Sequence, residues 1–193
     1  MHNPDENEQG QERERVVPAG EKAGIVDRFG FPMPQDLVID RLERTRWARE
    51  FSFQDISGLS EFLRACEIPQ GSYIIREGDE ERFLCIMLSG EAAVVKQDLQ
   101  GNKSELAVIS KGAAFGEQSL FEGRRRSASV VSKTDCIVLV LTHDHLRFME
   151  VEKPRVTCRV LFKLGTVLSE RLRATSANLV DAKTGIAPQA GVY

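Results

Sequence analysis

The sequence has 193 residues, of which 41% are hydrophobic and 28% are charged, and this balance fits one globular domain with appended segments rather than a fibrous or wholly disordered chain. No apolar run approaches the roughly 20 residues that cross a bilayer, so we expect no membrane association. The formal net charge is −3 and lies in residues 1–30, so the rest of the chain is neutral overall and lacks the broad basic face of a general nucleic-acid binder.

The first segment, residues 1–34, is polar and acidic and has no apolar periodicity. It also lacks the apolar stretch of a secretory signal. Segments of this composition cannot bury enough apolar surface to offset the loss of chain entropy. We therefore expect a disordered N-terminal tail.

Residues 35–66 have the apolar spacing of helices. Val38, Ile39 and Leu42 share one side of a helix in DLVIDRLERTRWAREF. The run DISGLSEFLRAC then predicts a second, shorter helix. We expect two N-terminal helices here.

Residues 67–142 consist of short runs that are rich in valine and isoleucine and are separated by glycines. Such runs predict many short strands in a sandwich or barrel of antiparallel strands. Leu106–Ile109 and Ile137–Leu141 are apolar enough to be buried on both faces of a sheet.

Residues 143–180 return to a helical pattern after Thr142, whose hydroxyl can cap a helix. HDHLRFMEVE predicts one short helix, and a long helix follows over residues 155–180. Leucines and one threonine recur along it every three or four residues, at Leu161, Leu164, Leu168, Leu172, Thr175 and Leu179. This stripe packs on the core or forms a seam between two subunits, and we favour the seam. Residues 181–193 have no periodicity and are expected to be a flexible tail.

Histidine and cysteine side chains give little support for a metal site. His143 and His145 could form a metal pair, but no other ligand set accompanies them, which favours the polar first turn of a helix. The cysteines are far apart and form no CxxC pair. Three of them, Cys85, Cys136 and Cys158, stand in apolar stretches, which favours buried free thiols in a reducing cytoplasm over disulfides or zinc.

The segment FGEQSLFEGRRRSASV, residues 115–130, combines features of an anion site with one carboxylate. Gly116 allows close backbone approach, a short helix can offer its first N–H groups, and an arginine can add a bidentate contact to a phosphate. Glu117 would repel a phosphate but can accept hydrogen bonds from sugar hydroxyls. These groups together suggest a nucleotide with a free sugar hydroxyl. The arginine run alone would instead be typical of a solvated turn, or of a basophilic kinase site at Ser127.

The same segment resembles the phosphate-binding cassette of cyclic-nucleotide-binding domains, which contains FGE, a leucine, a variable turn and R-[STA]-A-[ST]-V. The matching residues are Phe115–Glu117, Leu120 and Arg126–Val130, and glycines at 71, 78, 90 and 112 fit the framework of the family. The resemblance covers about residues 50–180. It implies an α+β fold in which an antiparallel β-roll, of the double-stranded β-helix or jelly-roll type, is flanked by N-terminal helices and by a short and a long C-terminal helix.

The resemblance also implies roles for site residues. The glutamate of the family binds the ribose 2′-hydroxyl, the arginine pairs with the cyclic phosphate, and backbone amides complete the site. By this match the ribose and phosphate residues are Gly116, Glu117, Ser119, Arg126, Ser127 and Ala128. Arg124 and Arg125 fall in the variable turn and are expected to be solvated. Gln118 and Ser119 are more polar than the usual Leu-Ala of the family.

The run RLRATSANL resembles the dimerisation helix of the bacterial catabolite activators within this family. The match implies that Thr175 and Ser176 contact the base, Ser176 across the dimer, and that Arg171 pairs with Glu117. This favours cyclic AMP over cyclic GMP, although a hydroxyl at Ser127 accompanies guanine preference in some members. Thr175 and Ser176 could also be incidental polar residues at a fraying helix end.

These features predict a cytoplasmic cyclic-nucleotide receptor that binds cyclic AMP, and less favourably cyclic GMP, and signals allosterically to an effector protein through its C-terminal helices. We expect a homodimer through residues 155–180, no catalysis, and no cofactor or metal. Only about 13 residues follow Val180, so we expect no helix-turn-helix and no direct DNA binding. The alternatives are a DNA-binding regulator, an interaction module that has lost nucleotide binding, and, more weakly, a phosphodiesterase.

Overall fold

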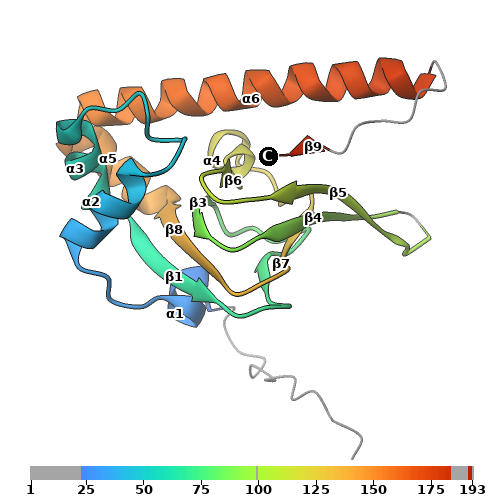
Figure 1. The fold of residues 1–193 in the computed structure, drawn as a ribbon, viewed down its shortest axis with the longest axis horizontal. Helices are drawn as coiled ribbons and strands as arrows, with labels where there is room; N and C mark the ends of the chain where they lie inside the picture. The colour runs from blue at the N-terminus through green and yellow to red at the C-terminus, as the bar shows by residue number, and fades with distance from the viewer. Residues whose placement is uncertain (1–22, 99, 184–190, 193) are drawn as a thin grey trace, which may run out of the picture.

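The computed structural model describes residues 23–98, 100–183 and 191–192, and its described part is built from two sheets and a set of flanking helices (Figure 1). The first sheet has the strand order β1-β8-β3-β6 and the second has the order β2-β7-β4-β5-β9. The strands are β1 (Arg64–Ile68), β2 (Tyr73–Ile75), β3 (Phe83–Ser89), β4 (Ala92–Gln97), β5 (Lys103–Ile109), β6 (Ala114–Phe115), β7 (Ser129–Ser132), β8 (Cys136–Thr142) and β9 (Gly191–Val192). All pairings are antiparallel except that of β5 with β9. The predicted antiparallel β-roll with flanking helices is confirmed.

The N-terminal segment contains a short helix, α1 (Ile25–Phe29), which packs on the β-roll. Ile25 is fully buried, and its backbone N–H donates to Glu81 Oε1 at 2.8 Å. The prediction of disorder over residues 1–34 is therefore wrong for its described part, residues 23–34. A single turn of helix is too short to show periodicity, and its position depends on contacts distant in sequence. Residues 1–22 lie outside the described residues.

The N-terminal helices α2 (Gln35–Glu43) and α3 (Phe53–Ser60) lie in the predicted order, but both are shorter than predicted. The first ends at Glu43, although the predicted helix ran to Phe51, and the second ends at Ser60. Its last predicted turn is instead strand β1, which pairs residue by residue with β8 from Arg64↔Val140 to Ile68↔Cys136. The β-roll therefore begins at Arg64 rather than at residue 67. Pairing with a buried strand has overridden the local helical pattern.

Two apolar clusters lie on opposite sides of β3 and β8. One contains Leu84, Ile86, Leu139 and Leu141 together with helical side chains. The other fills the interior of the roll and includes Phe83, Cys85, Met87, Val138 and Val140. Both strands are therefore buried on both faces, as predicted for Ile137–Leu141. The same prediction is wrong for Leu106–Ile109, because Leu106 is 55% exposed.

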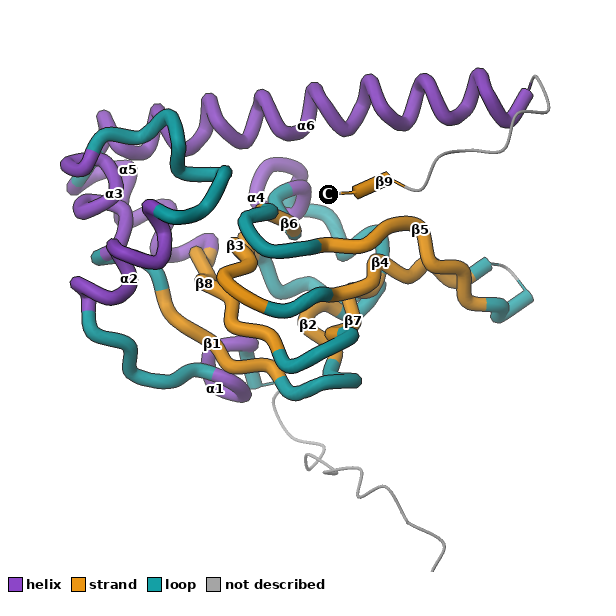
Figure 2. Tube along the Cα trace, in the orientation of Figure 1, coloured by secondary structure: helices purple, strands orange, loops and turns teal. Residues whose placement is uncertain are grey.

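The C-terminal helices are α5 (His143–Glu152) and α6 (Pro154–Lys183) (Figure 2). Thr142 caps α5 as predicted, since its Oγ1 accepts from the His145 N–H at 3.2 Å. With 30 residues, α6 is about 45 Å long and runs past the predicted end at Val180. The prediction of a flexible tail over residues 181–193 is wrong where the structure describes it, because the helix continues to Lys183 and Gly191–Val192 pair with β5. The other tail residues lie outside the described part.

Only the first half of α6 packs closely on the domain. Val160 and Leu164 are fully buried, whereas Leu172 is 69% and Leu179 is 57% exposed. The predicted leucine stripe is thus divided between the two roles considered for it. Its N-terminal leucines contribute to the core, and its C-terminal leucines are left uncovered in a single chain.

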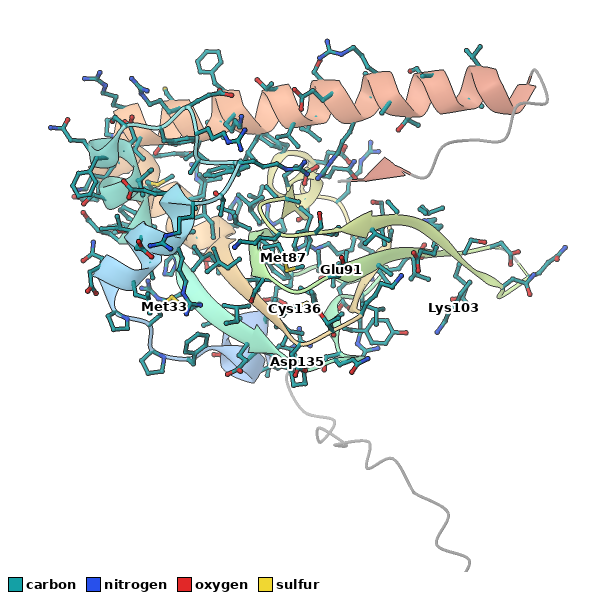
Figure 3. All side chains as sticks on the ribbon, viewed as in Figure 1. Met33, Met87, Glu91, Lys103, Asp135 and Cys136 are labelled. Atoms are coloured by element: carbon teal, nitrogen blue, oxygen red, sulfur yellow. The ribbon has the colours of Figure 1, made fainter. Side chains whose placement is uncertain are left out.

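The cysteines are free thiols. Burial raises the pKa of Cys66 to about 12 and also raises the pKa values of Cys85 and Cys136. Cys136 lies in the interior of the roll in Figure 3, whereas Lys103 extends from the far end of the β4–β5 hairpin. The prediction of burial is right for Cys85 and Cys136 and wrong for Cys158, which is exposed on α6.

Candidate functional site

A cavity of about 620 Å³ lies between the second sheet, the segment around α4 (Gln118–Glu122) and α6. This volume is in the range of small-molecule binding sites. Its lining combines apolar side chains with the charged residues of the cassette. The lining residues are Ile75, Val94, Lys96, Leu106, Ile109, Phe115, Gly116, Glu117, Gln118, Ser119, Glu122, Arg124, Arg125, Arg126, Ser127, Ala128, Val130, Leu168, Arg171, Leu172 and Thr175.

Gly116 joins strand β6 to the turn that begins α4. Its φ of 80° lies in the left-handed region that favours glycine. A Cβ atom here would lie 3.0 Å from the Phe83 carbonyl oxygen and 3.1 Å from Arg126 Nη1. Glycine therefore allows the backbone to approach the arginine that the motif assigns to phosphate.

Arg126 is only 6% exposed, and contacts from several residues hold its guanidinium in place. Nη1 donates to the Gly116 carbonyl at 2.7 Å, and Nη2 donates to the Phe83 carbonyl at 3.1 Å. The guanidinium carbon lies 4.2 Å from the centre of the Phe83 ring, which favours a cation. Burial lowers the pKa of Arg126, and the negative charges of Glu81, Glu117 and Asp79 oppose that shift.

Glu117 is 1% exposed, and Arg171 on α6 provides its counter-charge. Arg171 Nη1 donates to Glu117 Oε1 at 2.6 Å, and Nη2 donates to the Ala114 carbonyl. The predicted pair of Arg171 with Glu117 is thus present. It joins the cassette to the long helix and neutralises a carboxylate that would otherwise repel an anion.

Two buried polar atoms of the cassette have no hydrogen-bond partner within the described residues, Glu117 Oε2 and Arg126 Nε. Leaving such a group unpaired costs on the order of 1–3 kcal/mol. One is an acceptor and the other a donor, and both belong to residues that line the same cavity. The site can therefore supply a hydroxyl acceptor and an anion donor side by side.

The remaining cassette residues also line the cavity, but their hydroxyls are directed differently. Ser119 is buried, and its Oγ donates to the Gly116 carbonyl at 3.1 Å. Ser127 is exposed, and its Oγ donates to Gln118 Oε1 at 3.2 Å. Ala128 follows as a small residue at the wall. The structure therefore brings together every residue that the motif assigned to ribose and phosphate.

The residues assigned to the base are placed less uniformly. Arg171 and Thr175 line the cavity, together with Leu168 and Leu172 of α6. Ser176 is exposed and is not part of the lining in the single chain. Arg124 and Arg125 are exposed, as predicted, and Arg125 pairs with Glu80 on the surface.

Among the cavity residues that the sequence did not assign to the site are Lys96 on β4 and Leu106 on β5. Lys96 Nζ donates to Glu77 Oε1 at 2.6 Å and also to the Ser127 carbonyl, so it ties β4 to the cassette. The period-2 pattern of a strand places Lys96 on the same face as Val94, and this signal could have found it. Leu106 is the additional residue of a β-bulge, because Val94 pairs with Ala107 and Val95 pairs with Glu105. No local pattern marks that bulge.

The sequence predicts neither a metal site nor membrane association. His143 and His145 lie in the first turn of α5, and among the described residues no group of three or more histidine, cysteine or acidic side chains could hold a metal ion. Within the same part of the chain, no helix is long and apolar enough to cross a membrane.

Comparison with known families gives a match over residues 65–150 to the cyclic nucleotide-binding domain. The CRP-like cAMP-activated global transcriptional regulator of Mycobacterium tuberculosis is 28% identical over 126 residues, which are 65% of this chain and 54% of that protein. The cAMP-activated global transcriptional regulator CRP of Salmonella typhimurium is 32% identical over 119 residues, 60% of this chain and 55% of that protein. The chain thus spans about half the length of these relatives.

Solved structures show the same fold. A cyclic nucleotide-binding domain from Methylobacillus flagellatus superposes with a TM-score of 0.68 at 24% identity, covering 77% of this chain and 83% of that one. The catabolite activator protein of Thermus thermophilus superposes with a TM-score of 0.62 at 25% identity, covering 71% and 62%. The regulatory subunit of a cAMP-independent protein kinase A from Trypanosoma brucei gives 0.58 at 26% identity, covering 68% and 47%. The resemblance predicted from the cassette is confirmed.

Proposed function

We propose that this chain, which contains a cyclic nucleotide-binding regulatory domain related to those of CRP and of protein kinase A regulatory subunits, is a receptor for cyclic AMP. One observation carries the proposal. Arg126 and Glu117 are both buried at one cavity, and each retains a buried polar atom without a partner in the described chain. A cyclic phosphate and a ribose hydroxyl are the groups that would complete them.

The cyclic phosphate and the ribose hydroxyl are complementary in chemistry to Arg126 and Glu117. The Arg126 guanidinium has five N–H donors, so it can contact a cyclic phosphate while retaining bonds to backbone carbonyls. The ribose 2′-hydroxyl would donate to Glu117 Oε2, while Oε1 keeps its bond from Arg171. Because Arg171 balances the Glu117 charge, the cyclic phosphate can lie close to a carboxylate.

Preference for adenine rests on residues of α6 and on Leu106 of β5. Leu106, Leu168 and Leu172 offer apolar contacts to a purine, and the Thr175 hydroxyl can accept from the adenine amino group. Ser176 lies outside the cavity of its own chain, which agrees with a role toward the ligand of a second copy. We propose a homodimer through residues 155–180, with Ser176 of each copy directed to the other.

Signalling would pass through α6. Arg171 joins that helix to the carboxylate expected to bind ribose, so a ligand with different affinity for two α6 positions would shift their populations. We propose that an effector protein reads this shift. We also propose binding without catalysis, because the similar proteins are regulators and binding domains. The free thiols agree with a cytoplasmic location.

A second candidate is a transcription regulator, which is favoured by the similarity to the cAMP-activated transcriptional regulators of Mycobacterium tuberculosis and Salmonella typhimurium. It would require that this chain be joined to a DNA-binding part, or bind one as a partner. DNA binding that appears only with cyclic nucleotide would support this candidate over an effector protein. The expectation that the chain itself does not bind DNA directly stays a prediction.

Isothermal titration calorimetry with cyclic AMP and cyclic GMP tests the proposed function. We expect tighter binding of cyclic AMP, and a loss of about 2–3 kcal/mol for Arg126→Ala, because a charge-assisted contact to the phosphate is removed. Glu117→Ala should weaken binding by a comparable amount. Arg147→Ala is the control, because it removes an exposed arginine of α5 that does not line the cavity, and it should change affinity little.

Tight binding that survives both Arg126→Ala and Glu117→Ala would contradict the assigned site. No heat of binding, together with an unchanged melting temperature in millimolar cyclic nucleotide, would favour an interaction module without a ligand. Hydrolysis of cyclic AMP during incubation would instead favour the phosphodiesterase alternative.

A further inference from the structure

Strand β5 forms one wall of the cavity and also carries a short additional strand at its outer edge. Leu106 and Ile109 line the cavity. On the side away from β4, residues Ala107 and Val108 pair in parallel with Gly191 and Val192 of β9. An open strand edge offers backbone groups to any extended segment. Here the occupant is Gly191–Val192 of the same chain.

The position of β9 coincides with a local irregularity of β5. The β-bulge at Leu106 lies immediately before the two residues that pair with β9. Bulges end or redirect pairing near binding sites and turn side chains toward them. The bulge therefore separates a cavity-lining residue, Leu106, from the edge at which β9 binds.

The connection from α6 has enough length to return to the cavity. Thr175 lines the cavity eight residues before Lys183, a rise of about 12 Å along the helix. From Lys183 to Gly191 there are eight further steps, which can span up to about 26–29 Å. The sequence separation between Lys183 and Gly191 is therefore long enough for β9 to pair with β5, and Figure 1 draws β9 between α6 and β5.

The C-terminal half of α6 exposes much of its apolar surface. Leu172, Leu179 and Val180 are all more than half exposed. The Arg171 bonds to Glu117 and Ala114 link this half to the cassette. A strand that joins the end of α6 back to β5 would restrict its movement away from the cavity.

We propose that Gly191–Val192 form a strap that adds to the β5 edge and holds α6 over the cavity, so that release of the strap and exchange of the ligand are coupled. The strap itself is a property of the fold, and its effect on ligand exchange rests on the proposed function. The partner that fits the β5 edge is an extended segment of this same chain, recognised through its backbone.

Amide hydrogen exchange tests the docking of the strap without any ligand. The full chain is compared with a chain that ends at Lys183 and with Val192→Pro, which removes a strand N–H but keeps the length. We expect the edge-facing amide in Ala107–Val108 to exchange about tenfold faster in both variants. Amides of Ala93 and Val94, which pair β4 with β5 and β7, are the internal control and should not change.

A peptide with the sequence of residues 184–193 should restore protection to the chain that ends at Lys183, and a scrambled peptide should not. Equal exchange at Ala107–Val108 in all variants would overturn the proposal. Protection that rises with protein concentration would also overturn it, because the strand would then come from a second copy.

The coupling to ligand is measured as the dissociation rate of a fluorescent cyclic AMP analogue, which should increase about tenfold in both variants. An unchanged rate with increased amide exchange would overturn the coupling. If the analogue does not bind the full chain, the proposed function fails, but the exchange result still decides whether β9 is docked.

Discussion

At the scale of single residues, the site depends on two charged side chains that are almost completely buried. Burial of an ion is costly unless counter-charges and hydrogen bonds compensate. Arg126 donates hydrogen bonds to two backbone carbonyl oxygens and lies against an aromatic ring. Glu117 forms an ion pair with the Arg171 guanidinium. Each charge is therefore stable before any ligand binds, and each side chain keeps one buried polar atom without a partner in the described part of the chain.

Gly116→Ala tests how closely the cassette backbone must approach Arg126. We expect a loss of about 2–3 kcal/mol in the free energy of unfolding, because an alanine at φ 80° is strained and its Cβ would press on the Phe83 carbonyl. Urea denaturation measures this loss, and calorimetry should show weaker nucleotide binding. Gly71→Ala is the matched control, since Gly71 has φ 78° and no atom within 4 Å of the added Cβ. Equal losses in the two variants would show that crowding at Gly116 is unimportant.

The central residues of the site could be predicted because their chemistry appears directly in the sequence. A glycine, a carboxylate and an arginine at fixed spacing indicate an anion beside a hydroxyl, and the structure brings Gly116, Glu117 and Arg126 to one cavity. Lys96 and Leu106 were missed for a different reason. Their place in the cavity comes from strand register and from a bulge, which depend on pairing between β4 and β5.

At the scale of elements, ion pairs fasten the N-terminal helices to the C-terminal ones. Asp55 of α3 pairs with Arg159 of α6 at 3.2 Å, and Glu50 pairs with Lys163 at 2.7 Å. Asp55 is 5% exposed and also completes a capping box with Ser52, so it orders its own helix as well. These ion pairs fix the N-terminal half of α6. We therefore expect any movement of this helix in its C-terminal half.

Asp55 should contribute a pH-dependent part of stability. Burial opposes ionisation, but the hydrogen bonds with Ser52 and the charges of Arg159 and Arg155 prevail and lower the pKa of Asp55. A lowered pKa stabilises the folded chain above the unfolded value of about 3.9, and this contribution is lost as the pH falls through the folded value. At pH 7 we expect Asp55→Asn to reduce the free energy of unfolding by about 1 kcal/mol.

Urea denaturation from pH 7 to pH 3.5 measures this contribution, and the difference between Asp55→Asn and the natural chain should shrink as the pH falls. Asp40→Asn is the control, because Asp40 makes an exposed pair with Arg44 one helical turn away and should have little effect. A difference that stays constant over the pH range would contradict the assignment to the ionised Asp55.

Element types were predicted well where local and tertiary preferences agree. Thr142 and the run after it give α5 its start and its apolar side, so its bounds follow from the sequence. The helix expected over residues 55–66 fails at its end, because Arg64–Ile68 gain more by pairing with the buried strand β8. The α1 helix was missed because Ile25 finds its place only against Glu81 and the core of the roll.

At the scale of the whole molecule, α6 presents an apolar surface that a single chain does not cover. Phe162 is 80%, Leu172 is 69% and Leu179 is 57% exposed. Exposed apolar surface of this kind marks an interaction site. The residues Phe162, Ser176 and Leu179 all lie within residues 155–180, the part of the helix that the sequence predicts to be a dimer seam. Covering this surface with a second copy would also bring Ser176 near another subunit.

The double substitution Phe162→Glu with Leu179→Glu tests the dimer and the role of Ser176 together. We expect the natural chain to sediment as a dimer and the double variant as a monomer, because charges would be buried in the apolar seam. Phe148→Glu on α5 is the control, since that residue is 59% exposed but lies against Phe62 rather than on α6, and it should leave the dimer intact.

In the dimeric chain, Ser176→Ala should weaken cyclic AMP binding about fivefold, as expected for one lost hydrogen bond. The same substitution should have no effect in the monomeric double variant, because Ser176 lies outside the cavity of its own chain. An equal effect in both backgrounds would show that Ser176 acts within one chain. A natural chain that stays monomeric at every concentration would instead contradict the seam on α6, and Ser176 would then have no partner cavity to reach.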